Sequence, residues 1–530
     1  MENYDAIVVG GGISGLTSAA YLARAGSNVI LFEKNDKCGG LVNSFTKDGF
    51  LFDGGVRALE SAGIILPMLK ELEIELETVK SPVSLGIENE IIHINSEESL
   101  SDYAALLRKF YPDSENEIEN VISVIKKITK DMEVLYGVDN PLFMNFLKDK
   151  VYFVKVYLPW LFKFLLTLRR INKMKMPVEE LLGKMVKNNS LNDIISQHFF
   201  KSTPAFFAMS YFYLYQDYFY PRGGVGKLAE AVQKKIQEFG GKVKTGTEIE
   251  KVLSASNTLM DKEGNSYKYN DLIWAADLKK LYSITTTENL PQEIAEKIES
   301  FRNELSEKHG TDSVFSLFIA VDEPPENFET ITRGHFFYTP SKKGLGETNR
   351  SELKNIVQHF SETSKEKILE WLDKYCELNT YEISIPVLKD PRAAPEGKTG
   401  LIVSILFGYE LVKKIKEAGW YAEFKENVEN KMIEVLSRSV FPMLENKIIF
   451  KFSATPLSIE SIVGSSEGSI VGWSFEDPIP VTSSMLKVND SVKTFIPNVL
   501  QAGQWTYSPS GVPMCILTGK LAADKASEAK

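Results

Sequence analysis

The stretch YDAIVVGGGISGLTSAAYLARAGSNVILFEK, residues 4–34, decides the fold. Residues 4–9 are rich in Ile and Val, as in a strand that is buried on both faces. A small-residue segment of helical length comes next, and a second apolar run lies at 28–32. This order of strand, helix and strand predicts a β-α-β unit, and therefore an α/β fold with a parallel sheet.

Three glycines and one acid in this unit predict a nucleotide site. Gly10, Gly12 and Gly15 form the pattern GxGxxG between the first strand and the helix. Gly10 allows the tight turn, Gly12 lets the backbone approach a pyrophosphate, and Gly15 lets the helix pack closely on the strand. Glu33 ends the second strand, where its carboxylate can accept hydrogen bonds from ribose hydroxyls and repel a 2′-phosphate. The neighbouring residues expected at the same site are Ile13, Ser14 and Lys34.

NAD and FAD both use this fingerprint, so the choice between them rests on the segments beyond Glu33. Two more glycine pairs come after the second strand, and there a backbone without side chains can run against a long, flat ligand. Near the C-terminus a short strand leads to Gly503, and Gly511 opens an apolar helix whose N–H groups can face the pyrimidine edge of a reduced flavin. These contacts favour FAD over NAD. The residues expected at FAD from these segments are Gly39, Gly40, Gly54, Gly55, Gly503, Gly511, Val512 and Pro513.

Four later segments extend the pattern along the chain. They are YFYPRGGVGKLAEAVQKKIQEFGGKVKTGTEIEKVL with LIWAAD (218–253 and 272–277), YEISIPVLKDPRAAPEGKTGLIV (381–403), TPLSIESIVGSSEGSIVGW (455–473) and PNVLQAGQWTYSPSGVPMCILTGKLAADK (497–525). Together with the N-terminal unit, they resemble the phytoene desaturase, carotenoid isomerase and retinol saturase group of FAD-dependent oxidoreductases. More broadly, the chain resembles the monoamine oxidase fold superfamily.

The resemblance implies a Rossmann-like FAD-binding domain of the GR2 flavoprotein type. We expect this domain to be built from three separate segments, 1–80, 218–285 and 490–530. Residues 81–217 and 286–489 are expected to form a substrate domain of mixed sheet and helices. Within 286–489, the periodicity predicts strands at 314–321, 381–387 and 401–408 and helices at 365–376 and 421–436. Relatives commonly carry Arg where Leu41 stands and an acid where Gln504 stands, although the Gln504 amide can still hydrogen-bond the ribityl chain. The residues that the resemblance adds to the cofactor site are Leu41, Val56, Ile249, Ala276 and Gln504.

The same resemblance implies an enzyme that desaturates, saturates or isomerises carbon–carbon bonds of a long apolar polyene, such as a carotenoid or retinoid. Two alternatives stay open: the oxidation of an amine, as in monoamine oxidases, and a non-catalytic lipid carrier of the same fold. Arg57 comes after the second glycine pair and is expected beside the flavin, or else in an ion pair that holds its loop. Trp473 and Tyr507 are expected around the flavin ring, or else in ordinary core packing.

Residues 148–176 combine aromatic, aliphatic and basic side chains in an otherwise acidic chain. The longest uncharged run there, 156–162, is far shorter than the roughly 20 residues that span a bilayer, so the segment is not expected to cross. A helix that docks on an anionic membrane surface fits this composition. The alternative is a core helix whose basic side faces water. A second aromatic cluster at 206–220 is expected to line an apolar tunnel or to pack in the core.

Charge and composition exclude other classes of partner. The formal net charge of -10 over 530 residues argues against nucleic acid. The five histidines include no pair with metal-ligand spacing, so no metal site is expected. Three widely separated cysteines indicate a reducing compartment, and no secretion signal precedes the first strand. The chain is therefore expected in the cytoplasm, with peripheral membrane contact if residues 148–176 dock.

Overall fold

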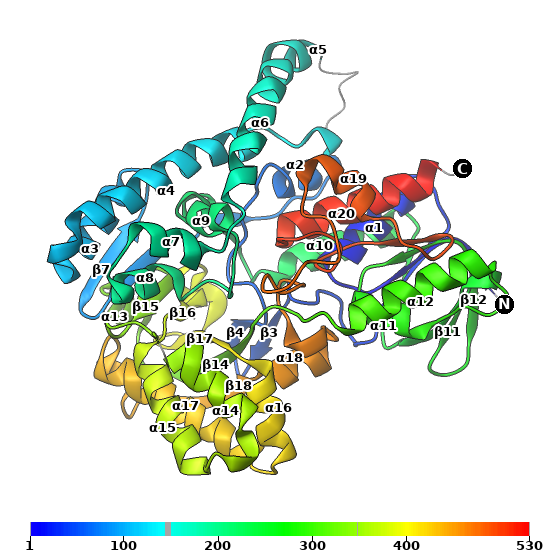
Figure 1. The fold of residues 1–530 in the computed structure, drawn as a ribbon. Coiled ribbons are helices and arrows are strands. Elements are labelled where there is room, and N and C mark those ends of the chain that lie inside the picture. Colours follow the sequence, from blue (N-terminus) through cyan, green and yellow to red (C-terminus); the bar gives the residue numbers. More distant parts are fainter. Residues whose placement is uncertain (1, 144–149, 347, 529–530) are drawn as a thin grey trace.

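The structure is a computed structural model that describes residues 2–143, 150–346 and 348–528 (Figure 1). Residues 1, 148–149 and 529–530, at the ends of three predicted segments, lie outside this part of the chain. Two large sheets organise the described residues, and helices cover both.

The first sheet has eight strands in the order β13-β10-β11-β12-β1-β2-β9, with β19 added beside the second half of β12. Strand β1 lies between β2 and β12 and is parallel to both, as the predicted β-α-β unit requires. The strands are β1 Glu2–Val9, β2 Val29–Phe32, β9 Lys242–Lys244, β10 Ile249–Leu253, β11 Thr258–Asp261, β12 Ser266–Trp274, β13 Thr285–Thr286 and β19 Val499–Gln501.

Helices bury both faces of this sheet, which explains why β1 is apolar throughout. Ala6 and Val8 pack in one cluster with helices α1 (Ile13–Arg24), α10 (Gly226–Glu238) and α20 (Val512–Glu528). Ile7 and Val9 point to the other cluster, with α11 (Leu278–Ile284) and α12 (Gln292–Ser306). Since β1 alternates its side chains between the two clusters, the arrangement confirms the predicted Rossmann-like α/β class.

The second sheet has seven strands in the order β18-β14-β17-β16-β15-β6-β7, antiparallel except for the pair β15 and β6. The predicted strand 381–387 ends early, at Ser384, because Pro386 begins a short 3₁₀ turn. The strands are β6 Val83–Ile87, β7 Glu90–Ile94, β14 Ser313–Val321, β15 His335–Thr339, β16 Tyr381–Ser384, β17 Thr399–Phe407 and β18 Ile448–Ala454. Two hairpin-like pairs join the sheets, β3 Ser44–Lys47 with β4 Phe50–Asp53, and β5 Thr78–Lys80 with β8 Phe219–Pro221.

Two groups of helices cover the second sheet. One group packs on the face of β14 and β17 and comprises α13 Pro325–Glu329, α14 Leu353–Gln358, α15 Lys365–Leu378, α16 Tyr409–Glu417 and α17 Tyr421–Arg438. The other packs over β6 and forms a layer of α3 Ser99–Phe110, α4 Glu115–Tyr136, α7 Val178–Met185, α8 Asn189–Ser196 and α9 Ala205–Asp217. The remaining short helices are α2 Ile65–Glu71, α18 Pro456–Val463 and α19 Val488–Ser491.

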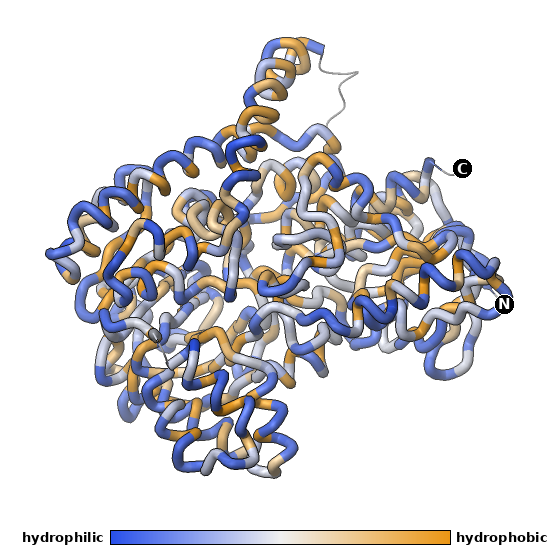
Figure 2. Tube along the Cα trace, in the orientation of Figure 1, coloured by the Kyte–Doolittle hydropathy of each residue, from blue (hydrophilic) through white to orange (hydrophobic). Residues whose placement is uncertain are grey.

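One helix projects from this layer into solvent (Figure 1). It consists of α5 (Lys150–Tyr152), a π turn (Phe153–Tyr157) and α6 (Leu158–Ile171), and only the α6 end packs on α4. By length and composition, the 25 residues Lys150–Met174 are apolar enough to cross a membrane. The uncharged run 156–162 understates this apolar length, because Lys155 and Lys163 are the only charged residues in 151–168. That the segment does not cross a membrane stays a prediction. Figure 2 shows the apolar residues along the projecting part.

Candidate functional site

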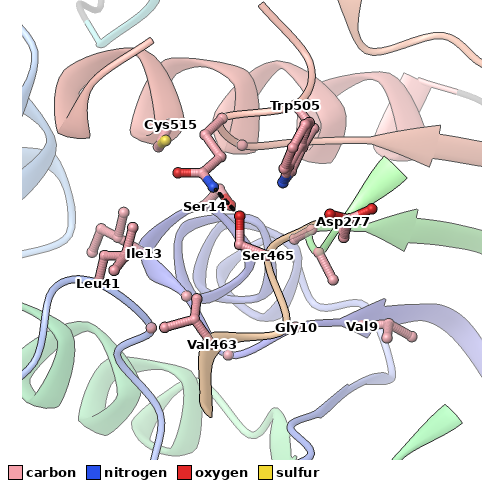
Figure 3. Close-up of a pocket in the computed structure, with 18 of the residues that line it drawn as sticks. Val9, Gly10, Ile13, Ser14, Leu41, Asp277, Val463, Ser465, Trp505 and Cys515 are labelled. Carbon is pink, nitrogen blue, oxygen red and sulfur yellow. Dashed lines mark hydrogen bonds between the residues drawn. The ribbon is translucent and has the colours of Figure 1, made fainter. Parts of the chain in front are cut away.

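A cavity of about 630 Å³ opens where β1, β2, β12 and β19 end (Figure 3). Val9, Phe32 and Trp274 end three of these strands and line it, and Ala502 comes directly after the fourth. Ligands of open parallel sheets bind at the carboxyl ends of the strands, so this cavity is the expected nucleotide site.

Gly10 and Gly15 of the glycine turn have the packing roles predicted for them. A Cβ on Gly10 would come within 2.7 Å of the carbonyl oxygen of Ala275, and one on Gly15 within 1.9 Å of the carbonyl oxygen of Gly10. These two glycines therefore allow the turn and the close packing of α1. A Cβ on Gly12, by contrast, meets no protein atom within 4 Å. Gly12 also begins α1, so its bare backbone and the helix N-terminus leave room for a phosphate.

Glu33 is oriented at the end of β2 by two backbone donors. Its Oε2 accepts a hydrogen bond from the Gly11 N–H at 2.7 Å, and its Oε1 accepts one from the Asn35 N–H at 2.8 Å. Each carboxylate oxygen keeps further acceptor capacity on the cavity side. This arrangement fits an acid that binds the two hydroxyls of a ribose.

The C-terminal segment forms another wall of the cavity. Gly503 has φ +103° and donates its N–H to the Thr518 hydroxyl of α20 at 3.0 Å. The Gln504 amide donates to the Ser465 hydroxyl at 3.1 Å, the bond drawn in Figure 3. This bond ties the C-terminal segment to the loop after α18 and holds the Gln504 amide at the cavity.

Most of the residues expected at the cofactor line this cavity. They are Gly10, Gly12, Ile13, Ser14, Glu33, Lys34, Gly39, Gly40, Leu41, Val56, Ile249, Ala276, Gly503, Gln504, Gly511 and Val512. Gly15, Gly54, Gly55 and Pro513 do not line it. Contact of these residues with a cofactor stays a prediction.

The second glycine pair has a packing role in the structure. A Cβ on Gly54 would come within 2.2 Å of the Asn43 side chain, and one on Gly55 within 1.9 Å of the Leu41 carbonyl oxygen. The pair therefore lets two loops pack against each other, whereas the sequence was interpreted as leaving room for a ligand.

One wall of the cavity was not predicted from the sequence. Val463, Gly464, Ser465 and Ser466 lie at the end of α18 and just beyond it, and they face the glycine turn of β1 across the cavity (Figure 3). Their segment was part of the resemblance, but nothing in its spacing pointed to a ligand. Only the packing of α18 near α16 and β14 brings it to the first sheet.

The three candidate catalytic residues lie outside the cavity lining. Trp473 is fully buried, and its indole N–H donates to the Trp505 carbonyl at 2.9 Å. Trp505, which was not predicted from the sequence, lines the cavity instead. Tyr507 is buried and donates to the Ser483 carbonyl at 3.3 Å. For Trp473 and Tyr507 these contacts are those of core packing.

Arg57 connects the end of β4 to the second sheet. Its guanidinium donates to the Asp53 carbonyl at 2.6 Å and to the Ser404 hydroxyl of β17 at 3.1 Å. Burial lowers the pKa of Arg57, while the carboxylates of Glu382 and Asp53 oppose this effect. These contacts are those of the alternative interpretation, in which Arg57 holds its loop. A role at the flavin stays a prediction.

A second cavity, of about 70 Å³, lies between the helical layer and strands β6 and β15. We call it the α9 cavity, because Ala208, Met209, Tyr211, Phe212 and Tyr215 of α9 form one wall. The other lining residues are Leu85, Gly86, Ile87, Tyr103, Leu106, Ile125, Ile194, Ile195, His198, Phe199, Phe337, Thr339 and Thr380. Part of the aromatic cluster at 206–220 therefore lines a small apolar space, and the same residues pack in the core of the helical layer. An apolar tunnel stays a prediction.

Glu60 lies beside the Gly511 end of the first cavity and was not selected from the sequence. A Cβ on Gly511, which lines the first cavity, would lie 3.6 Å from Glu60 Oε1. The charge of Glu60 also raises the pKa of Tyr211, which lines the α9 cavity. Burial raises the pKa of Glu60 itself to about 7, and the charge of Asp217 raises it further. Glu60 is thus a carboxyl that can be protonated near neutral pH.

No group of three His, Cys, Asp or Glu side chains in residues 2–143, 150–346 and 348–528 could hold a metal ion. The first cavity, over the first sheet, has the parts that a dinucleotide needs, and we call it the FAD cavity. Its volume, the open approach at Gly12 and the oriented Glu33 carboxylate fit FAD.

Comparisons with known proteins agree with this geometry. The model of a family described as flavin containing amine oxidoreductase matches residues 13–351. All-trans-retinol 13,14-reductase of Macaca fascicularis is 22% identical over 511 residues, which cover 89% of this chain and 77% of that protein. The 1-hydroxycarotenoid 3,4-desaturase of Flavobacterium sp. (strain P99-3) is 21% identical over 541 residues and 98% of each chain.

A solved structure shares the fold. A triple mutant of putrescine oxidase superposes with a TM-score of 0.62 and 14% identity, over 100% of this chain and 99% of that one. The predictions of FAD and of an oxidoreductase are confirmed by the family match. Because this match covers more than half of its length, the chain belongs to the flavin-containing amine oxidoreductases and is an FAD-dependent oxidoreductase.

Proposed function

We propose that the enzyme changes carbon–carbon bonds of a long apolar polyene by desaturation, saturation or isomerisation. The α9 cavity is the observation that carries this proposal. It is lined mainly by aliphatic and aromatic side chains, which suit a long apolar substrate. The retinol reductase and carotenoid desaturase relatives support the same substrate class.

Binding and proton handling are the tasks of the protein side chains. The glycine turn, Glu33 and the residues around Gly503 and Gly511 would hold the cofactor in the first cavity. Bound FAD supplies hydride transfer. Adding hydrogen across a double bond also requires a proton, and removing hydrogen releases one. The Glu60 carboxyl can hold that proton, because its pKa of about 7 allows both protonation states near neutral pH.

We also propose that the projecting helix docks on the surface of an anionic membrane, where an apolar substrate would be taken up. Seven large apolar side chains of this helix are exposed, and Phe162 is the most exposed, at 68%. Exposed apolar residues beside Lys155, Lys163 and Arg169 suit the boundary between acyl chains and headgroups. The protein would then lie at the cytoplasmic side of the membrane as a peripheral protein.

The anaerobic visible spectrum of the purified protein tests the reaction. We would record it with phytoene, lycopene isomers, retinol and a panel of amines, before and after reduction with dithionite. Bleaching of the oxidised flavin by a polyene indicates desaturation, and reoxidation of the reduced protein indicates saturation. A changed isomer with no net bleaching indicates isomerisation.

Two results would contradict the proposal. Bleaching by an amine alone would favour the amine oxidase alternative. A protein that takes up no FAD would favour the lipid carrier.

A further inference from the structure

The α9 cavity contains unused hydrogen-bonding groups among its apolar walls. Tyr215 is only 4% exposed, and its hydroxyl has no hydrogen-bond partner among the described residues. A buried donor without a partner is costly, and such groups in a folded protein are rare. Thr339 and Thr380 do not need a ligand, because their hydroxyls bond each other at 2.8 Å.

His198 lies close to Tyr215 in the same cavity. Both rings lie beside the ring of Phe337, with centroid separations of 5.9 Å for His198 and 5.3 Å for Tyr215. Burial lowers the pKa of His198 to about 4, so its imidazole is neutral at physiological pH. A neutral imidazole offers one donor and one acceptor. The cavity lining therefore carries a phenol donor and a neutral imidazole that pack against the same ring, Phe337.

The charges around Tyr215 and His198 favour a neutral hydroxyl over a carboxylate on the ligand. The carboxylate of Glu382 acts on both: it raises the pKa of Tyr215 and opposes the lowering at His198. His335 shares this carboxylate in a 3.0 Å contact, while Arg57 and Lys389 lower the pKa of Glu382. A ligand carboxylate in the cavity would be repelled by Glu382 and would have no cation to pair with in the lining. A neutral hydroxyl would use both the Tyr215 donor and the His198 acceptor.

We propose that the α9 cavity binds the oxygen-bearing end of the substrate, and that the substrate is a polyene alcohol. The Tyr215 hydroxyl donates to the alcohol oxygen, and a ring nitrogen of His198 accepts the alcohol proton. A cavity of about 70 Å³ holds a chain end, so the rest of the polyene extends past Tyr211 towards Glu60 and the FAD cavity. This assignment rests on the proposed function and adds a specificity site to it.

Equilibrium binding of a matched pair of probes tests the proposal without turnover. The probes are all-trans-retinol and axerophtene, a hydrocarbon with the same polyene chain and a methyl group in place of the hydroxymethyl group. We would load the FAD-containing protein from cyclodextrin and quantify bound ligand after ultrafiltration. We expect retinol to bind about tenfold more tightly than axerophtene, because an unpaired Tyr215 hydroxyl remains in the axerophtene complex. We expect retinoic acid to bind more weakly than retinol.

Two variants test whether the preference for retinol over axerophtene arises in the α9 cavity. Tyr215→Phe and His198→Phe should each bring the retinol to axerophtene ratio towards one, while axerophtene binding stays within about twofold. Tyr269→Phe is the matched control. Its hydroxyl is also buried without a partner among the described residues, but Tyr269 lies on β12 and lines neither cavity. It should keep the wild-type ratio.

The possible failures separate this inference from the proposed function. Equal binding of retinol and axerophtene by the wild type would overturn the alcohol site and leave a polyene substrate in place. A retinol preference that survives both variants would also overturn it. Tighter binding of retinoic acid would overturn the assignment of an alcohol. Binding of none of the three probes would contradict the proposed function together with this inference.

Discussion

At the scale of single residues, Gly12 gives the sharpest test of the FAD site. A Cβ there meets no protein atom within 4 Å, and the backbone has an ordinary φ of -70°. We therefore expect Gly12→Val to fold with nearly unchanged thermal stability in the absence of FAD. The same side chain would occupy the space of the pyrophosphate, so the purified variant should be colourless. Its visible spectrum and its unfolding temperature after removal of FAD measure the two effects.

Gly15→Val is the matched control for this substitution. A Cβ on Gly15 would lie 1.9 Å from the carbonyl oxygen of Gly10, so this variant should fail to fold or should accumulate as aggregate. A Gly12→Val protein that stays yellow would show that FAD approaches the sheet elsewhere.

Glu60 is expected to make stability and turnover depend on pH. Its pKa of about 7 lies above the ordinary value of 4.5 for a glutamate, so the folded protein holds a proton that the unfolded chain releases. The free energy of unfolding should therefore fall as pH rises from about 4.5 to about 7, by about 3 kcal/mol at most. Asp217, Tyr136, Tyr211 and Tyr218 face Glu60, and of these only Asp217 is charged in this range.

Glu60→Gln should remove this part of the pH dependence of unfolding. If the enzyme saturates a double bond, the wild-type rate should fall as pH passes about 7, because the protonated carboxyl is the donor. If it desaturates, the rate should rise over the same interval. Denaturant unfolding and turnover from pH 5 to 8, each compared with the variant, measure both effects. Identical unfolding curves for wild type and variant would show that Glu60 is solvated and ordinary.

At the scale of elements, the projecting helix is expected to carry the membrane contact. Val154 and Phe162 are 60% and 68% exposed, and their burial in a membrane would contribute about 1.5–3 kcal/mol each. The double variant Val154→Ser with Phe162→Ser should therefore bind anionic liposomes at least tenfold more weakly. Sedimentation with liposomes of phosphatidylserine and phosphatidylcholine measures this effect.

The control for this variant removes exposed apolar side chains elsewhere. Ile449 of β18 and Ile462 of α18 are 45% and 61% exposed, and their replacement by Ser should leave liposome binding unchanged. An equal loss in both double variants would mean that binding is unspecific. Replacing Arg170 would not test the attraction of basic residues to anionic lipids cleanly, because Arg170 pairs with Asp131 of α4 and supports the fold.

Helices and strands with a clear hydrophobic periodicity were predictable from the sequence, whereas individual tertiary contacts were not. The strand expected at 314–321 is β14, one residue longer at its start, and the helix expected at 365–376 is α15, which ends two residues later. A local apolar pattern decides such elements. The uncharged run 156–162 was a poor guide to the projecting helix, since Lys155 and Lys163 interrupt the run without interrupting the helix.

The residues of the site differ in the same way: those with local roles were predictable, and those defined by tertiary contacts were not. The glycine turn and Glu33 were predictable, because their roles depend on neighbours within one β-α-β unit. Glu60 and His198 were not, because each is defined by groups that come from other elements. Glu60 acquires its environment from α9 and from the loop before α20, and His198 from β15. The spacing of residues in the sequence does not indicate such contacts between distant elements.

At the scale of the whole molecule, a buried group of charges joins the loop after β4 to the second sheet. Arg57 comes from the loop after β4, and its guanidinium contacts Ser404 of β17. Lys389, which comes after β16, donates to the Arg57 carbonyl at 2.9 Å, and burial lowers the pKa of this lysine to about 8. The charge of Glu382 favours the charged forms of both cations. Val56, the neighbour of Arg57, lines the FAD cavity, so this group ties one wall of that cavity to the second sheet.

Removing one cation from this group should therefore destabilise the whole molecule. We expect Arg57→Met to lower the free energy of unfolding by about 3–5 kcal/mol, because Glu382 and Asp53 lose a buried partner. Arg392→Met is the control, since Arg392 is exposed and water screens its pair with Asp390, so its loss should change the free energy of unfolding much less. Chemical unfolding measures the loss, and the flavin spectrum of the folded fraction should be unchanged. A stable Arg57→Met protein with an altered flavin reduction potential would instead place Arg57 at the flavin ring, the other role that its sequence position suggests.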